Sequence, residues 1–154
     1  MIEKIHVYDV DGTLVDSSHR YAALPNGEVD LAHWLANHHR IDDDTLLPLA
    51  EQYRADIADP TVYVVICTLR TPHPADIRYI AQHLGMPDKL IMNVKNESEN
   101  LRGFKRRHLA RLFNLRQFAN LPRYFWEDSR GYVESCRDLF TRVYHVQSDQ
   151  EFTA

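Results

Sequence analysis

One stretch of this sequence constrains the fold more than any other. Residues 61–67 form an unbroken, mostly β-branched apolar run, Thr-Val-Tyr-Val-Val-Ile-Cys. A strand with one face in water alternates apolar and polar residues, whereas a strand covered on both faces of a parallel sheet is apolar throughout. The run therefore predicts an interior strand of a parallel sheet, and the rest of the chain must supply helices for both faces.

Strand and helix patterns alternate along the chain on both sides of this run. Further strands are predicted over residues 4–9, 90–94, 124–126 and 142–146. Helices with one apolar stripe are predicted from residue 31, from about residue 44, over 74–84, over 101–115 and from about residue 132. Right-handed crossovers between such strands give a mostly parallel sheet between two helical layers. The predicted fold class is α/β, a Rossmann-like three-layer sandwich.

The chain length fits one domain. Its 154 residues lie within the usual domain size of roughly 100–200 residues, so we expect a single domain over residues 1–154. Residues 13–27 read as a loop. Two predicted helices then precede the second strand, more than a crossover needs, and we expect a small helical cap at about residues 16–60.

Composition indicates a soluble protein. The chain is 44% hydrophobic and 26% charged, which is typical of globular domains. No apolar run reaches the roughly 18 residues of a membrane span, and an acid at position 3 differs from a signal peptide. We therefore expect a cytoplasmic protein without a membrane contact. Its two cysteines, Cys67 and Cys136, are too few for a disulfide framework and are expected to be buried thiols.

Acidic side chains follow two of the predicted strands. Asp9 and Asp11 come after the first strand, and Asp128 comes after the fourth. In parallel sheets, ligands bind at the carboxyl ends of the strands, where these residues are expected to meet. Carboxylates gathered in one crevice repel each other unless a cation or a proton intervenes, and Mg²⁺ prefers such oxygen ligands. Zinc fits poorly, because the nearby histidines at positions 33, 38 and 39 lack the spacing of a zinc site.

The order of these residues resembles that of the haloacid dehalogenase-like (HAD) phosphohydrolases. The features that carry the resemblance are Asp9-Val-Asp11-Gly-Thr-Leu after an apolar strand, Thr68 after the next, Lys105 on a later helix and the acidic pair Glu127-Asp128. In finer detail, Thr68-x-Arg70 and the aromatic residues before the acidic pair are similar to polynucleotide 3′-phosphatases and Swiss Army Knife RNA repair-like HAD domains. The sequence departs from them after the pair, where Tyr132 stands about where those relatives often carry His.

The resemblance implies an Mg²⁺-dependent phosphomonoesterase. Asp9 would be the nucleophile that forms an aspartyl-phosphate. Asp11 would protonate the leaving oxygen and then deprotonate the attacking water. The ion would be held by Asp9, the backbone carbonyl of Asp11 and Asp128, with Glu127 as a further ligand or as a residue that orients the ligands.

The same resemblance implies how the phosphate is held. Thr68 and Lys105 would bind phosphoryl oxygens, with Lys95 as the alternative lysine. We expect Thr13, Arg70 and Arg106 to bind substrate. Alternatively, Arg70 would form an ion pair that fixes the loop after the strand of residues 61–67.

The substrate class stays open at this point. Residues 100–126 carry seven bases and no acid, which favours a nucleotide or a nucleic-acid phosphate end, either RNA or DNA. Tyr21, Trp34 and Tyr124 are candidate stacking faces for bases. A sugar phosphatase, a metal-dependent nuclease and a non-catalytic phosphate-binding module remain alternatives. The sequence leaves the oligomeric state open.

Overall fold

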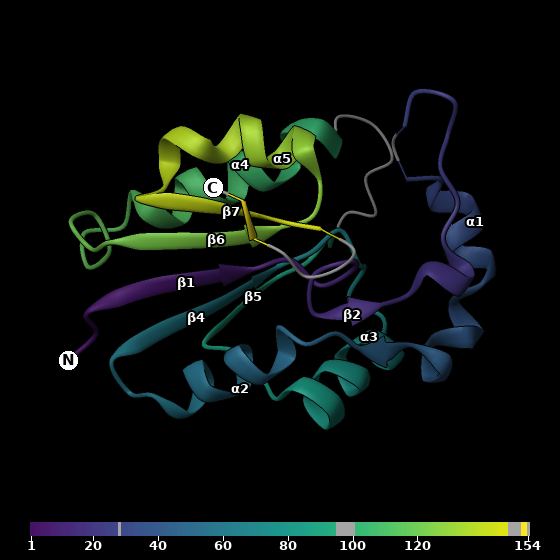
Figure 1. Ribbon diagram of the computed structural model, residues 1–154, viewed down its shortest axis with the longest axis horizontal. Coiled ribbons are helices and arrows are strands. Elements are labelled where there is room, and N and C mark those ends of the chain that lie inside the picture. The colour runs from purple at the N-terminus through teal and green to yellow at the C-terminus, as the bar shows by residue number, and fades with distance from the viewer. Residues whose placement is uncertain (28, 95–100, 148–151, 154) are drawn as a thin grey trace.

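A six-stranded sheet forms the centre of the fold, with the strand order β5-β4-β1-β6-β7-β8 (Figure 1). The computed structural model describes residues 1–27, 29–94, 101–147 and 152–153. Neighbouring strands pair in parallel except β8, which is antiparallel to β7. The strands are β1 (Lys4–Tyr8), β4 (Val62–Cys67), β5 (Lys89–Ile91), β6 (Arg123–Glu127), β7 (Arg142–Val146) and β8 (Phe152–Thr153).

Helices cover both faces of the sheet. On one face lie α4 (Leu101–Phe113), α5 (Arg130–Cys136) and the short turn η4 (Arg137–Leu139); on the other lie α2 (Ala50–Ala58), α3 (Pro74–Tyr79) and its continuation η3 (Ile80–Leu84) (Figure 1). This arrangement confirms the predicted α/β three-layer sandwich with a mostly parallel sheet.

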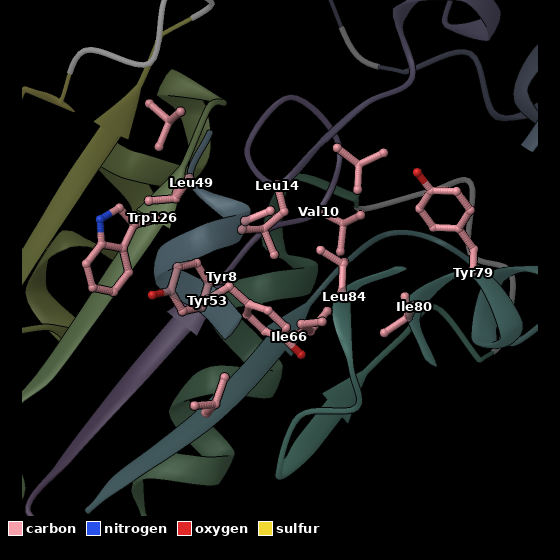
Figure 2. Packing of buried hydrophobic residues seen from close by; sticks show 14 of the residues in the cluster. Tyr8, Val10, Leu14, Leu49, Tyr53, Ile66, Tyr79, Ile80, Leu84 and Trp126 are labelled. Carbon is pink, nitrogen blue, oxygen red and sulfur yellow. The ribbon is translucent and has the colours of Figure 1, made fainter. Parts of the chain in front are cut away.

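The apolar run of β4 supplies side chains to both cores. Val64 and Ile66 pack in the cluster beneath α2, where Tyr53 closes over the sheet (Figure 2). Val65 and Cys67 face the opposite cluster, together with residues of α4 such as Leu109. These four residues are fully buried. The prediction that this strand is covered on both faces is therefore confirmed.

The largest difference from the sequence-based expectation lies between β1 and β4. The helix expected from about residue 44 begins at Ala50, after Pro48. Residues ahead of it form β3 (Thr45–Leu46), which pairs antiparallel with β2 (Val15–Asp16) inside the expected loop. Proline lacks a backbone N–H and disfavours helical backbone in the residue before it, so a helix that includes Leu46 and Leu47 is disfavoured and the helix begins after Pro48.

Residues between these two short strands lie at the carboxyl ends of the sheet strands (Figure 1). They contain η1 (Ser18–Arg20), α1 (Leu31–Ala36) and η2 (His38–Asp43). Helix α2 was expected in the cap, but it packs on the sheet instead. The candidate cap is therefore reduced to residues 16–49. That a cap operates here stays a prediction. No helix among the described residues is long and apolar enough to cross a bilayer.

Candidate active site

Asp9 lies immediately beyond the end of β1, with its side chain 8% exposed. Its backbone N–H donates to the carbonyl of Trp126, which continues the pairing of β1 with β6 by one step. Each oxygen of its carboxylate accepts one hydrogen bond: Oδ1 from Lys105 Nζ at 2.7 Å and Oδ2 from Thr13 Oγ1 at 3.0 Å. The structure therefore holds the expected nucleophile in one orientation.

Lys105 contacts this carboxylate from α4, which lies on the other face of the sheet from α2 and α3. Its ammonium also donates to Glu127 Oε1 at 2.8 Å and lies 4.8 Å from the ring centroid of Tyr132. Burial opposes its charge, but Asp9 and Glu127 outweigh this effect and raise the pKa of Lys105. In the same way, burial would raise the pKa of Asp9, but the ammonium holds that pKa below its usual value. At neutral pH both groups are charged.

Two further carboxylates complete the cluster. Asp9, Glu127 and Asp128 each offer an oxygen within 4.8 Å of the others. The backbone of Gly12 makes room for this approach: it has a φ of 79°, and a Cβ there would lie 2.1 Å from Asp128 Oδ2. Only glycine combines this left-handed conformation with this closeness at low cost.

The cluster has fewer positive charges than carboxylates. Burial and the negative charge of Asp9 raise the pKa of Glu127 well above its usual value. The same two causes raise the pKa of Asp128 to about 9, although the positive charge of Lys105 opposes the shift. The second oxygen of Glu127, Oε2, is buried without a hydrogen-bond partner among the described residues. A group of carboxylates with raised pKa values and one unpartnered oxygen fits a hard divalent ion such as Mg²⁺.

Asp11 lies beside this cluster and faces a buried arginine. Arg70 donates from Nη2 to Asp11 Oδ1 at 2.7 Å and from Nε to Oδ2 at 3.1 Å. The hydroxyl of Ser17 donates to the same Oδ1 at 2.7 Å. The side chain of Asp11 is 29% exposed, whereas that of Arg70 is fully buried. The structure thus favours the ion-pair interpretation of Arg70 and gives it a specific task, the orientation of Asp11.

Arg70 is one part of a buried charge network that the sequence did not reveal. It also pairs with Asp44 at 3.0 Å and with Asp76 at 3.3 Å. Asp44 in turn accepts two hydrogen bonds from Arg20, whose guanidinium stacks on Trp34 at 3.8 Å from the ring centroid. In the sequence, Asp76 looks like an ordinary acidic residue in the first turn of the helix that begins at Pro74. No local sequence pattern links it to residues as distant in the chain as Asp11 and Asp44.

Two histidines extend the network outward from Asp76. His38 Nε2 lies 2.5 Å from Asp76 Oδ2, and the rings of His38 and His73 are 4.2 Å apart. These three residues are close enough to share a metal ion. However, Nδ1 of His73 accepts from the backbone N–H of Ala75, and Asp76 is already paired with Arg70. The existing hydrogen bonds account for the cluster without an ion.

Three expected site residues remain. Thr68 is 1% exposed, and its hydroxyl accepts from the backbone N–H of Arg70 at 3.1 Å. Arg106 points to the far side of α4, where it pairs with the exposed Asp138. The structure does not bring Arg106 to the site. Lys95, the alternative phosphate ligand, lies outside the described residues.

A cleft of about 590 Å³ opens over the carboxylates. One wall comes from residues 16–34, including Ser18, Tyr21 and Trp34. The opposite wall includes Leu101 and Tyr132. Charged side chains thus gather at the bottom of the cleft, and its walls supply aromatic and aliphatic surface. Such a shape accommodates a phosphate with a less polar group attached to it.

Known proteins resemble the chain in sequence. A family model for the bacteriophage T5 5′-deoxynucleotidase matches residues 1–146. The 5′-deoxynucleotidase of Escherichia phage T5 is 33% identical over 84 residues, which cover 51% of this chain and 34% of that protein. The chain therefore spans about a third of the length of this curated relative.

Solved structures resemble the chain in fold. A chain of the Pnkp1/Rnl/Hen1 RNA repair complex superimposes with a TM-score of 0.67 at 20% identity, covering 95% of this chain and 43% of the other. The HAD domain of the effector protein Lem4 from Legionella pneumophila gives a TM-score of 0.56 at 14% identity, covering 97% of this chain and 89% of the other. The fold is thus HAD-like, and since the family model matches nearly the whole chain, the protein belongs to the family of the bacteriophage T5 5′-deoxynucleotidase.

Proposed function

We propose that this protein is a phosphatase that hydrolyses the phosphate monoester of a deoxynucleotide through an aspartyl-phosphate on Asp9. The observation that carries the proposal is the position of Asp9 at the bottom of the cleft, ionised by Lys105 and oriented by Thr13. Membership of the T5 5′-deoxynucleotidase family supports the substrate class.

In the first step, a carboxylate oxygen of Asp9 attacks phosphorus as the bond from phosphorus to the ester oxygen breaks, and the ester oxygen takes a proton from Asp11, which enters this step in its acid form. In the second step, Asp11, now a carboxylate, takes a proton from water, which attacks the same phosphorus, releases inorganic phosphate and restores Asp9. Arg70 and Ser17 fix the carboxyl of Asp11 for both transfers. The ammonium of Lys105 lies beside the nucleophile, where it can also attract phosphoryl oxygens as negative charge spreads over them.

The proposal includes Mg²⁺ as cofactor. Asp9, the backbone carbonyl of Asp11 and Asp128 would hold the ion, and Glu127 lies next to them. When bound, the ion supplies positive charge that lowers the repulsion between the phosphate dianion and the carboxylates. This role matches the shortage of positive charge in the cluster and the unpartnered Oε2 of Glu127.

A mononucleotide fits the described cleft better than a polynucleotide. The cations that line it among the described residues are Arg70 and Lys105, and each is already paired with at least two carboxylates. The basic residue Arg106, which was expected to contact a nucleic-acid backbone, faces away towards Asp138. The described lining of the cleft therefore supports a site for one phosphate and offers no further cation for a second.

Phosphate release tests the proposal. The substrates are deoxynucleoside 5′-monophosphates, 5′-phosphorylated oligonucleotides and sugar phosphates, each assayed with Mg²⁺ and with EDTA. We expect the mononucleotides to be hydrolysed fastest, at a rate that depends on Mg²⁺ and changes little with salt. Asp9→Asn should abolish release, whereas Asp42→Asn, at an exposed acid of η2, should retain it. Unchanged turnover by Asp9→Asn would reject the nucleophile.

A further inference from the structure

Three aromatic side chains among the described residues line the cleft. Two of them are buried and make contacts within the protein. Trp34 is 5% exposed, with the guanidinium of Arg20 over its ring. Tyr132 is 8% exposed, and its hydroxyl donates to the backbone carbonyl of Leu101. Tyr21, in contrast, is 47% exposed. The residues that the structure does not describe, 28, 95–100, 148–151 and 154, include no aromatic residue in the sequence.

The backbone that carries Tyr21 is firmly anchored. The preceding residue, Arg20, is fully buried and donates from Nε and Nη2 to the two oxygens of Asp44 at 2.9 and 2.7 Å. The backbone N–H of Tyr21 itself donates to the carbonyl of Ser18. An exposed ring on a fixed backbone loses little conformational freedom when a ligand covers it.

The ring also shares the cleft with the position expected for the phosphate. Tyr21, Asp9 and Asp128 all line this cleft. A nucleotide with its phosphate at Asp9 would extend along the walls of the cleft, and Tyr21 is on one of them. The ring is therefore placed to meet the part of the substrate that follows the phosphate.

We infer that Tyr21 is the specificity-determining residue of this site and that its ring stacks on the nucleobase of the substrate. The inference rests on the proposed function and adds the group that distinguishes a nucleotide from a sugar phosphate. Every base has a π face, so one ring can serve all four deoxynucleotides. Tyr21 does not take part in the chemical steps, and its contribution is to the binding of the base.

The test compares two esters that differ only in the base. The kcat/KM for deoxyadenosine 5′-monophosphate is divided by that for 2-deoxyribose 5-phosphate, in wild type, Tyr21→Ala and Tyr21→Phe. Loss of a stacked base typically weakens binding by about tenfold or more, so Tyr21→Ala should lower the ratio by at least that factor, mainly through KM for the nucleotide. Tyr21→Phe should keep the wild-type ratio. Leu24→Ala, at an exposed residue of the same segment that does not line the cleft, is the matched control.

Two results would overturn the inference. One is a Tyr21→Ala enzyme whose ratio equals that of wild type; the other is a Tyr21→Phe enzyme as impaired as Tyr21→Ala, which would assign the effect to the hydroxyl. Failure of the proposed function would look different, because wild type would then release phosphate from neither ester. In that event, equilibrium binding of deoxyadenosine 5′-monophosphate with Mg²⁺ decides: tenfold weaker binding by Tyr21→Ala supports the role of the ring, and equal binding refutes it.

Discussion

Replacement of Arg70 by Met should destabilise the protein strongly. The guanidinium is 1% exposed and pairs with Asp11, Asp44 and Asp76 at 2.7 to 3.3 Å. Asp44 keeps Arg20 and His19 as partners in the variant, but Asp76 keeps only His38 among its ion pairs in the described part of the chain. Removal of one partner from a buried ion pair typically costs about 3–5 kcal/mol, because the other charge remains buried and uncompensated.

For a chain of this size, 1 kcal/mol corresponds to about 2–4 °C in Tm, so Arg70→Met should lower Tm by roughly 6–20 °C. Calorimetry and urea unfolding measure the change. Arg106→Met is the matched control, since its exposed pair with Asp138 is screened by water and the variant should melt as wild type does. Adding Asp76→Asn to Arg70→Met should restore part of the loss by removing the stranded charge. The reasoning is refuted if Arg70→Met costs less than about 1 kcal/mol, or if the second substitution restores nothing.

Three further substitutions probe the carboxylate cluster. Lys105→Met should lower kcat by about 10²–10³-fold while Lys95→Met retains turnover; the opposite pattern in steady-state assays would transfer the role to Lys95. Glu127→Gln should raise the Mg²⁺ concentration for half-maximal activity by about 10–100-fold, and an unchanged Mg²⁺ titration would remove Glu127 from the ion's surroundings. Gly12→Ala should lower Tm more than Gly27→Ala, because both residues have positive φ but only Gly12 has Asp128 against it; equal melting curves would contradict the close approach.

The layered fold was readable from the sequence because its signal is local. The apolar run of residues 61–67 and the helical stripes around it depend on spacing within one segment, and burial on each face of the sheet follows from that spacing. The error between residues 44 and 50 has a local cause too. The predicted helix included Leu46 in its apolar stripe, although Pro48 favours extended backbone in the residue before it.

The candidate site was readable only in part. Asp9, Asp11 and Asp128 were expected to meet because the ends of parallel strands share one edge of the sheet, a rule that needs no knowledge of side-chain contacts. The partners of Arg70 were not accessible in this way. Asp44 follows η2 directly and Asp76 lies in α3, and no sequence spacing specifies which acid a buried arginine pairs with. Arg106 shows the converse case, since it was expected to bind substrate but pairs with Asp138.

The central claim is that Asp9 becomes phosphorylated during turnover, and chemical trapping of that residue tests it most directly. Wild-type protein in excess over deoxyadenosine 5′-monophosphate with Mg²⁺ is quenched in acid within a single turnover and treated with borohydride, which reduces an acyl phosphate to an alcohol. Peptide mass spectrometry should then find homoserine at position 9, dependent on substrate. Phosphate release at full rate with unmodified Asp9 at every quench time, or homoserine at another acid of the cluster, would contradict the account.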